Sequence, residues 1–429
     1  MKRSIALHCV LICFLFISAN SLQAQYLLNS DSAYKAGAAN SGRIWGYMFG
    51  DYYYKSHSDS LQRGGSNQYT GIPKTRSAFQ FRRIYLGYDY NITSKFSAEL
   101  LLAAEDNFPT GNPVSNVAVA GNTPQSGAGD LTGDGKLTFY IKLANIRWKN
   151  IWKGTDLVVG QVATPAFPLI SEKIWAYRSI ERTISDIRRT PSYDFGASLQ
   201  GKFDAKGNFG YNVLVANGSS AKPEGDNFKW FYGDVFAMFL DKKLVFDVYA
   251  DYERLAWTPT LHHSRQMLKG YIAYNTPGLT IGVEGFVNNL KNDITATKIA
   301  GGTDLLDNAA KGISFYIHGN IVPNKLRFFA RYDAFNPNSK VDNSTYNKYV
   351  QTTGNYNDNT YIGAAATGDM TYKQQFITAG LDFTPAKNVH FMPNIWYNHY
   401  ATQLAGLTGK VNGDYDMVLR MTFFFTFGK

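Results

Sequence analysis

Cysteine is almost absent from this chain of 429 residues, and its two cysteines, Cys9 and Cys13, both lie within the first 24 positions. Disulfide frameworks, thiol catalysis and cysteine-bound metals are therefore excluded for residues 25–429. Beyond residue 25 the sequence also lacks any apolar run of about 18 residues, which excludes a transmembrane helix from that part of the chain. Charged residues make up only 18% of the chain while aromatic residues reach 15%, and this balance argues against intrinsic disorder.

The first residues have the layout of a secretory signal peptide. Lys2 and Arg3 form a positive start, residues 10–17 are all apolar, and Ala24 is the small residue expected before a cleavage site. The apolar stretch is too short to span a bilayer as a helix, which needs about 20 residues. The sequence therefore predicts a cleaved signal peptide over residues 1–24 and a single domain over residues 25–429.

The rest of the chain contains segments of about ten residues in which apolar and polar side chains alternate, as in transmembrane β-barrels. Near the C-terminus, for example, Leu419 and Met421 alternate with Arg420 and Thr422. In such barrels the apolar side chains face lipid and the polar ones face the lumen, and closure of the sheet leaves no strand edge unpaired in hydrocarbon. We therefore predict an all-β fold, a transmembrane antiparallel β-barrel.

The alternation predicts about 16 strands. Their spans are 42–54, 77–90, 94–105, 136–149, 155–164, 192–203, 208–217, 229–240, 243–254, 266–275, 278–289, 311–321, 324–335, 372–383, 387–400 and 415–427. The connections between them alternate between long, such as residues 55–76, and short, such as residues 91–93. Outer-membrane barrels show this pattern because their periplasmic turns are short and their external loops are longer.

The third long connection, residues 165–191, has a different periodicity. Apolar residues recur at spacings of three and four residues, which is typical of an amphipathic helix: Ile170, Ile174, Tyr177, Ile180 or Glu181, Ile184 and Ile187. We expect its apolar stripe to dock on the inner wall of the barrel, so that the polar face narrows the lumen.

Basic side chains are frequent on the polar face of this loop. The candidates for an anion-facing constriction are Lys173, Arg178, Arg182, Arg188 and Arg189. Rings of Arg or Lys lower the electrostatic barrier for anions, and the guanidinium fork of Arg suits phosphate. The alternative is a surface helix whose charges are solvated, or are neutralised by Glu172, Glu181 and Asp186.

Residues 172–183, together with Asp186 and residues 192–196, resemble the phosphate-selective porin O and P family of outer-membrane porins, as found in Bacteroidetes-type bacteria. Residues 22–25 fit the cleavage region of that family. The resemblance implies a sixteen-stranded homotrimeric porin whose third loop folds into the channel, and phosphate as the solute of the better-known members. The lumen-lining candidates in this chain are Arg83, Lys142, Lys269, Arg327, Arg331 and Arg420, and acidic residues are interspersed among them.

One further motif concerns calcium. Asp130, Thr132 and Asp134 occupy the first, third and fifth positions of a calcium-loop pattern, but its twelfth position is Ile141 instead of the bidentate Glu. An Asp-Gly turn at the entry to the next strand explains the same residues. We predict no metal site and no cofactor.

These observations predict a porin in the outer membrane of a Gram-negative bacterium. Its expected role is passive diffusion of small hydrophilic solutes, with a preference for anions such as phosphate. Expected partners are these solutes, outer-membrane lipid and lipopolysaccharide. The net charge of +10 is not a sign of nucleic-acid binding in an exported barrel. The chain is not expected to be an enzyme; the alternatives are an outer-membrane hydrolase, or an adhesin that binds through its long external loops.

Overall fold

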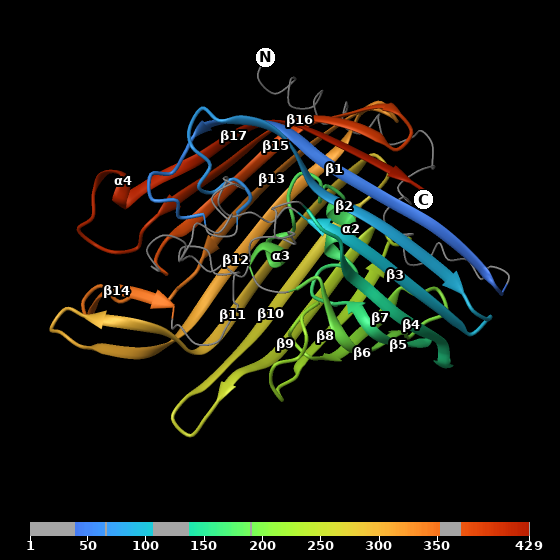
Figure 1. Cartoon of the computed structure of the whole chain (residues 1–429), viewed down its shortest axis with the longest axis horizontal. Coiled ribbons are helices and arrows are strands. Elements are labelled where there is room, and N and C mark those ends of the chain that lie inside the picture. Colours follow the sequence, from blue (N-terminus) through green and yellow to red (C-terminus); the bar gives the residue numbers. More distant parts are fainter. Residues whose placement is uncertain (1–38, 65–66, 106–136, 189–190, 352–369, 429) are drawn as a thin grey trace, which may run out of the picture.

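A closed antiparallel β-barrel forms the body of the protein (Figure 1). The computed structural model describes residues 39–64, 67–105, 137–188, 191–351 and 370–428. The predicted signal peptide and the calcium candidates Asp130, Thr132 and Asp134 lie outside these residues. Among the described residues, no helix is long and apolar enough to cross a membrane.

Sixteen strands make up the barrel wall, and every predicted strand is present. Most differ from the predicted spans by a few residues at their ends, but the strands predicted at 278–289 and 311–321 are each longer by eight residues or more. They are β1 (Ser41–His57), β2 (Ser77–Asn91), β3 (Phe96–Glu105), β4 (Tyr140–Trp152), β5 (Thr155–Ala163), β6 (Tyr193–Lys202), β7 (Phe209–Ala216), β8 (Trp230–Phe239), β9 (Leu244–Trp257), β10 (His262–Asn275), β11 (Leu279–Lys298), β12 (Thr303–Val322), β13 (Leu326–Asn336), β15 (Lys373–Ala386), β16 (Val389–Ala401) and β17 (Gly413–Phe427). Each strand pairs with its neighbours in the chain, and β1 pairs with β17 from Gly46 opposite Phe427 to His57 opposite Met417, which closes the sheet.

Side chains alternate between the two faces of the wall as predicted. On β17, Leu419 and Met421 are exposed on the outside while Arg420 and Thr422 are buried inside. Apolar residues are likewise exposed at alternate positions on the other strands, for example Leu268 and Ile272 on β10. The outer surface is therefore apolar and suits contact with lipid.

The short connections contain residues with left-handed backbone. Asn324, between β12 and β13, has φ 62°, and Asn388, between β15 and β16, has φ 67°. Asparagine tolerates this conformation better than most residues because its short polar side chain can hydrogen-bond locally. These positions allow tight turns at one end of the barrel.

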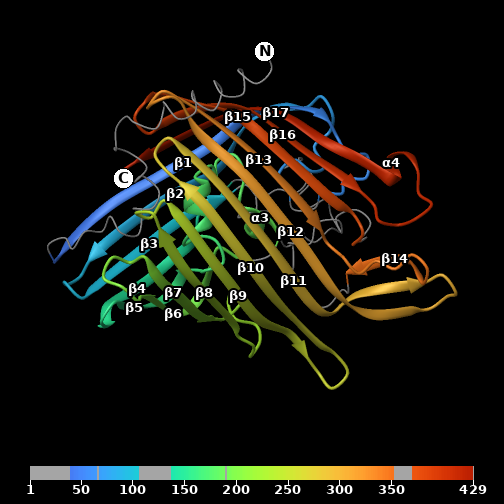
Figure 2. The same ribbon diagram turned by 180° about the vertical axis from the view of Figure 1, so that it is seen from behind.

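An extension at the opposite end was not predicted. We expected residues 290–310 to form a loop, but β11 and β12 continue through most of this range as a hairpin in which Thr295 pairs with Leu305. A further strand, β14 (Tyr346–Gln351), lies within the predicted loop 336–371 and pairs with the outer part of β11. We call this three-stranded projection the arm; it consists of Ile294–Lys298, Thr303–Leu306 and β14. Figures 1 and 2 both show it extending away from the barrel wall.

The third loop lies inside the barrel, as predicted (Figures 1 and 2). It is not one continuous helix: the structure divides it into α2 (Ser171–Trp175) and α3 (Ile184–Arg188). Ala176 ends α2 with a left-handed φ of 64°, and Ile180 and Glu181 then donate backbone hydrogen bonds to the carbonyl of Tyr177. A third short helix, α4 (Gly409–Asn412), precedes β17.

Candidate functional site

An apolar stripe attaches the third loop to the inner wall. Ile174, Ile180 and Ile184 are almost completely buried, as expected from their spacing. Trp175 packs against Tyr316 of β12, with ring centroids 5.0 Å apart. The prediction that the stripe docks inside the barrel is therefore confirmed by its contacts.

Two buried arginines of the wall bind the turn between α2 and α3. Arg82 of β2 donates from Nη1 to the carbonyl oxygens of Ser179, at 2.9 Å, and Ile180, at 3.3 Å. Arg420 of β17 donates from Nη2 to the carbonyl oxygen of Ile180 at 3.1 Å. These carbonyls lie in a turn between two short helices, so the arginines satisfy acceptors that regular secondary structure does not.

The next two carbonyls of the turn also accept from side chains. Trp175 Nε1 donates to the carbonyl oxygen of Glu181 at 2.8 Å. Arg331 of β13 donates from Nη1 to the carbonyl oxygen of Arg182 at 2.5 Å. Four consecutive peptide carbonyls, from Ser179 to Arg182, therefore accept hydrogen bonds from side chains.

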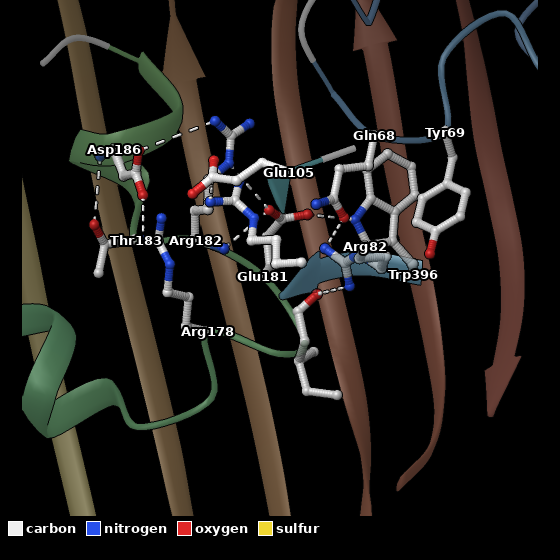
Figure 3. Close-up of polar contacts among 12 residues, drawn as sticks. Gln68, Tyr69, Arg82, Glu105, Arg178, Glu181, Arg182, Thr183, Asp186 and Trp396 are labelled. Atoms are coloured by element: carbon white, nitrogen blue, oxygen red, sulfur yellow. Dashed lines mark hydrogen bonds and ion pairs between the residues drawn. The ribbon is translucent and has the colours of Figure 1, made fainter. Parts of the chain in front are cut away.

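Side chains of the loop bind the wall as well. Trp396 Nε1 of β16 donates to Glu181 Oε2 at 2.8 Å (Figure 3). Burial raises the pKa of Glu181, but the positive charges of Arg182 and Arg82 and the Trp396 bond outweigh it, so this pKa lies below its usual value. Glu181 is therefore a carboxylate inside the barrel at neutral pH.

On the other side of the loop, Tyr177 donates from its hydroxyl to Asp382 Oδ2 of β15 at 3.2 Å. The backbone amide of Ser185 donates to Glu284 Oε1 of β11 at 3.1 Å. Together with the arginine and tryptophan bonds, these contacts connect the loop to strands around much of the barrel.

Carboxylates bind two of the five basic residues of the loop that we proposed for the constriction, Arg178 and Arg182. Arg178 Nη1 lies 2.6 Å from Asp186 Oδ2 and also binds Glu172, and Arg182 Nη1 lies 4.0 Å from Asp186 Oδ1 (Figure 3). Lys173 is half-buried on α2. Arg188 is the last residue of α3, and Arg189 lies outside the described residues. The polar face of the loop therefore contains ion pairs between basic and acidic side chains, and is not a ring made of basic groups alone.

The lumen-lining candidates face the inside of the barrel, and each forms an ion pair or a hydrogen bond with another side chain of the wall. Arg83 and Lys142 both bind Glu105, at 2.8 Å and 2.5 Å. Lys269 binds Asp247 at 3.0 Å. The remaining pairs are Arg327 with His318, Arg331 with Asp333 and Arg420 with Asn394. Sequence spacing predicts which of these side chains face the lumen, but it does not reveal partners on other strands.

Arg82 is the main functional candidate that the sequence analysis missed. Strict alternation turns only one of the consecutive residues Arg82 and Arg83 inward, and we chose Arg83. The pairing of β1 with β2 shifts between Phe49 and Gly50, and this bulge leaves both arginines buried inside. Two adjacent arginines in an alternating strand are the only sequence signal of this arrangement.

Metal binding has no obvious place in this site. Over the described part of the chain, no group of three or more His, Cys, Asp or Glu side chains is placed to bind a metal ion. The arrangement can instead narrow a passage through the barrel and present alternating positive and negative charges to it.

Comparison with known proteins supports the fold. No protein-family model matches the chain, and no curated protein matches it in sequence. Among solved structures, the outer membrane channel DcaP of Acinetobacter baumannii is similar with a TM-score of 0.55 and 12% identity, over 91% of this chain and 98% of that one. The outer-membrane expressed OmpT of Vibrio cholerae is similar with a TM-score of 0.52 and 10% identity, over 91% of this chain and 99% of that one. The resemblance to the phosphate-selective porin O and P family stays a prediction, whereas the fold is that of an outer-membrane β-barrel.

Proposed function

We propose that this protein is an outer-membrane channel through which small hydrophilic solutes diffuse passively. The observation that carries the proposal is a closed barrel of sixteen strands with its third loop bound inside. Barrels of about 16–18 strands are wide enough for an aqueous channel, and a loop bound inside narrows that channel. The apolar outer surface supports a location in the outer membrane of a Gram-negative bacterium.

Single-channel recording tests this proposal. We expect the refolded protein to give discrete, stable current steps in planar bilayers. Folding is checked separately by the change in gel migration between heated and unheated samples. A folded barrel that never conducts would contradict the proposal.

A preference for anions such as phosphate is a separate part of the proposal, and the charges inside the barrel give it less support. On β8 to β11 the buried charged residues other than histidine are Asp234, Asp247, Asp251, Glu253, Arg265, Lys269, Glu284 and Asp293. Acidic groups outnumber basic groups on this wall, and Arg178 and Arg182 of the third loop are paired with carboxylates. Anion selectivity therefore requires that the loop charges outweigh the acidic wall.

The reversal potential under a salt gradient decides this point. A potential on the anion side that falls in an Arg178→Gln, Arg182→Gln double variant would support anion selection by the loop. A potential at zero or on the cation side would exclude it. Phosphate added as a competing ion then tests specificity, because only a phosphate site would reduce the chloride current at low phosphate concentration.

The proposed assembly is a homotrimer, as the family resemblance implies, with lipid and lipopolysaccharide around it. Sedimentation of the detergent-solubilised protein tests the assembly. A monomeric mass across a range of protein concentrations would contradict it.

A further inference from the structure

We propose that Arg82, Arg331 and Arg420 are positioning residues that set the width of the passage, and that they do not act as anion-binding groups. They do so by fixing the peptide carbonyls of Ser179, Ile180 and Arg182 in the turn to the barrel wall. The claim about the width of the passage rests on the proposed channel function. The claim that these arginines hold the turn against the wall can be tested without measuring conductance.

Each of the three arginines bridges the loop and the wall. Arg331 binds both carboxylate oxygens of Asp333, at 2.8 Å and 2.5 Å, and uses its third nitrogen for the loop carbonyl. Arg420 donates from Nε to Asn394 Oδ1 at 2.7 Å while Nη2 reaches the loop. A planar guanidinium with five donors can make both connections at once.

Arg82 also bridges the loop and the wall, but its contact with the wall is an ion pair without a hydrogen bond from Nε. Its Nε lies 3.4 Å from Asp51 Oδ2 of β1, while Nη1 binds the loop carbonyls. The arginines come from β2, β13 and β17, so the turn is fixed from separate positions along the wall. One lost bridge therefore loosens the turn without removing the barrel strands that support it.

Burial keeps solutes away from these groups. Arg82, Arg331 and Arg420 are only 2%, 3% and 4% exposed. Aromatic rings lie near their guanidinium groups: Arg331 lies 5.3 Å from the ring centre of Trp175, and Arg420 lies 5.3 Å from that of Tyr69. An arginine whose donors bind carbonyls and whose plane lies near a ring is not available to a passing anion.

Lysine substitutions separate positioning of the turn from binding of anions. Lysine keeps the positive charge but has a single nitrogen on a flexible stem, so it cannot reproduce the planar bridge. We therefore expect Arg82→Lys, Arg331→Lys and Arg420→Lys each to loosen the turn while leaving the charge in the lumen unchanged. Arg147→Lys is the matched control, because Arg147 binds two residues of the wall instead of the loop: Asp156 of β5 at 3.0 Å and Gln200 of β6 at 2.8 Å.

A single cysteine reports on the turn directly. Residues 25–429 contain no cysteine, so Ser179→Cys provides one thiol at a position that is only 6% exposed. We expect a maleimide to label this thiol slowly in the parent barrel and about tenfold faster or more in each lysine variant, as for the loss of a charge-assisted hydrogen bond. The Arg147→Lys control should label at the parent rate.

Conductance provides the second measurement. The lysine variants should show larger or noisier current steps with an unchanged reversal potential. The inference is overturned if the lysine variants match the parent in labelling and conductance while the corresponding glutamine variants shift the reversal potential. If the parent barrel does not conduct, the proposed channel fails, but the labelling rates still decide whether these arginines position the turn. The three variants are independent, so misfolding of one leaves two to decide the question.

Discussion

The third loop and the arm connect strands at the same end of the barrel, yet one turns inward and the other projects outward. In the third loop, isoleucines at helical spacing pack against the inner wall, and wall arginines bind its carbonyls. In the arm, β11 and β12 keep their ladder, with Thr295 opposite Leu305 and also opposite Val350 of β14. The polar backbone groups of the two regions are therefore satisfied in different ways: by side chains of other strands in the loop, and by neighbouring strands in the arm.

This difference shows what determines whether a long connection between strands folds into the barrel or projects away from it. The arm carries its own hydrogen-bond partners, and its buried side chains Ile294, Ala296 and Tyr349 belong to the same apolar cluster as Ile184 of the third loop. The turn of the third loop depends on donors from β2, β13 and β17. We therefore expect substitutions in the loop to change the lumen strongly and substitutions on the exposed face of the arm to leave it unchanged.

The largest difference between the two regions should appear when one apolar residue in each is replaced with Asp. Ile184 is 1% exposed in the third loop, whereas Leu305 is 42% exposed on the arm. Ile184→Asp places a charge among apolar side chains and should destabilise loop docking by about 3 kcal/mol or more. Leu305→Asp should change stability by about 0.5 kcal/mol or less.

Maleimide labelling at Ser179→Cys measures this contrast, with denaturant unfolding of the barrel as the second measurement. Ile184→Asp should label much faster than the parent, and Leu305→Asp at the parent rate. Equal labelling of the two variants would mean that the loop is not docked through its apolar stripe.

A smaller contrast should appear with pH. Because the pKa of Glu181 lies below its usual 4.5, its contribution to docking is complete above that pH and is lost as the pH falls through the lower folded-state value. We therefore expect larger or noisier current steps in strongly acidic buffer. Glu181→Gln should already show them at neutral pH and should change less on acidification.

Asp342→Asn is the control for this experiment, because Asp342 is exposed on the connection before β14. It should behave like the parent at every pH. A Glu181→Gln channel with the same pH response as the parent would show that another group controls docking in acid.

The smallest effect should follow removal of most of the arm. Replacing residues 295–305 with Asn-Gly joins Ile294 to Leu306, which already face each other across the ladder, through a favoured two-residue turn. We expect the barrel to fold and its conductance to match the parent. A closed or unstable channel would contradict the separation of the arm from the lumen.

Much of the fold could be predicted from the sequence because a barrel strand depends on local alternation. Arg420 and Thr422 face inward and Leu419 and Met421 outward, as the pattern on β17 indicates. The arm was missed because we ended the strand at residue 289, although Ile294 and Ala296 continue an alternating pattern on the buried face. We expected a long external loop at this end of the barrel, and for that reason we did not extend the strand along the alternating pattern.

The candidate site was less predictable because its partners come from distant strands. The buried isoleucines of the loop have a periodic signal, and their docking was predicted. The bonds from Arg82 to Ser179 and from Trp396 to Glu181 have none, since each depends on barrel closure. The bulge that turns Arg82 inward is also set by pairing with β1 and not by the local sequence.

The pairing of β1 with β17 has a consequence for how the protein is made. Gly46 lies opposite Phe427, so the first strand must wait for the last before its second edge is covered. Until then the growing chain exposes an open strand edge and apolar side chains that favour aggregation. Truncation within β17 should convert a stable product into a target for proteolysis.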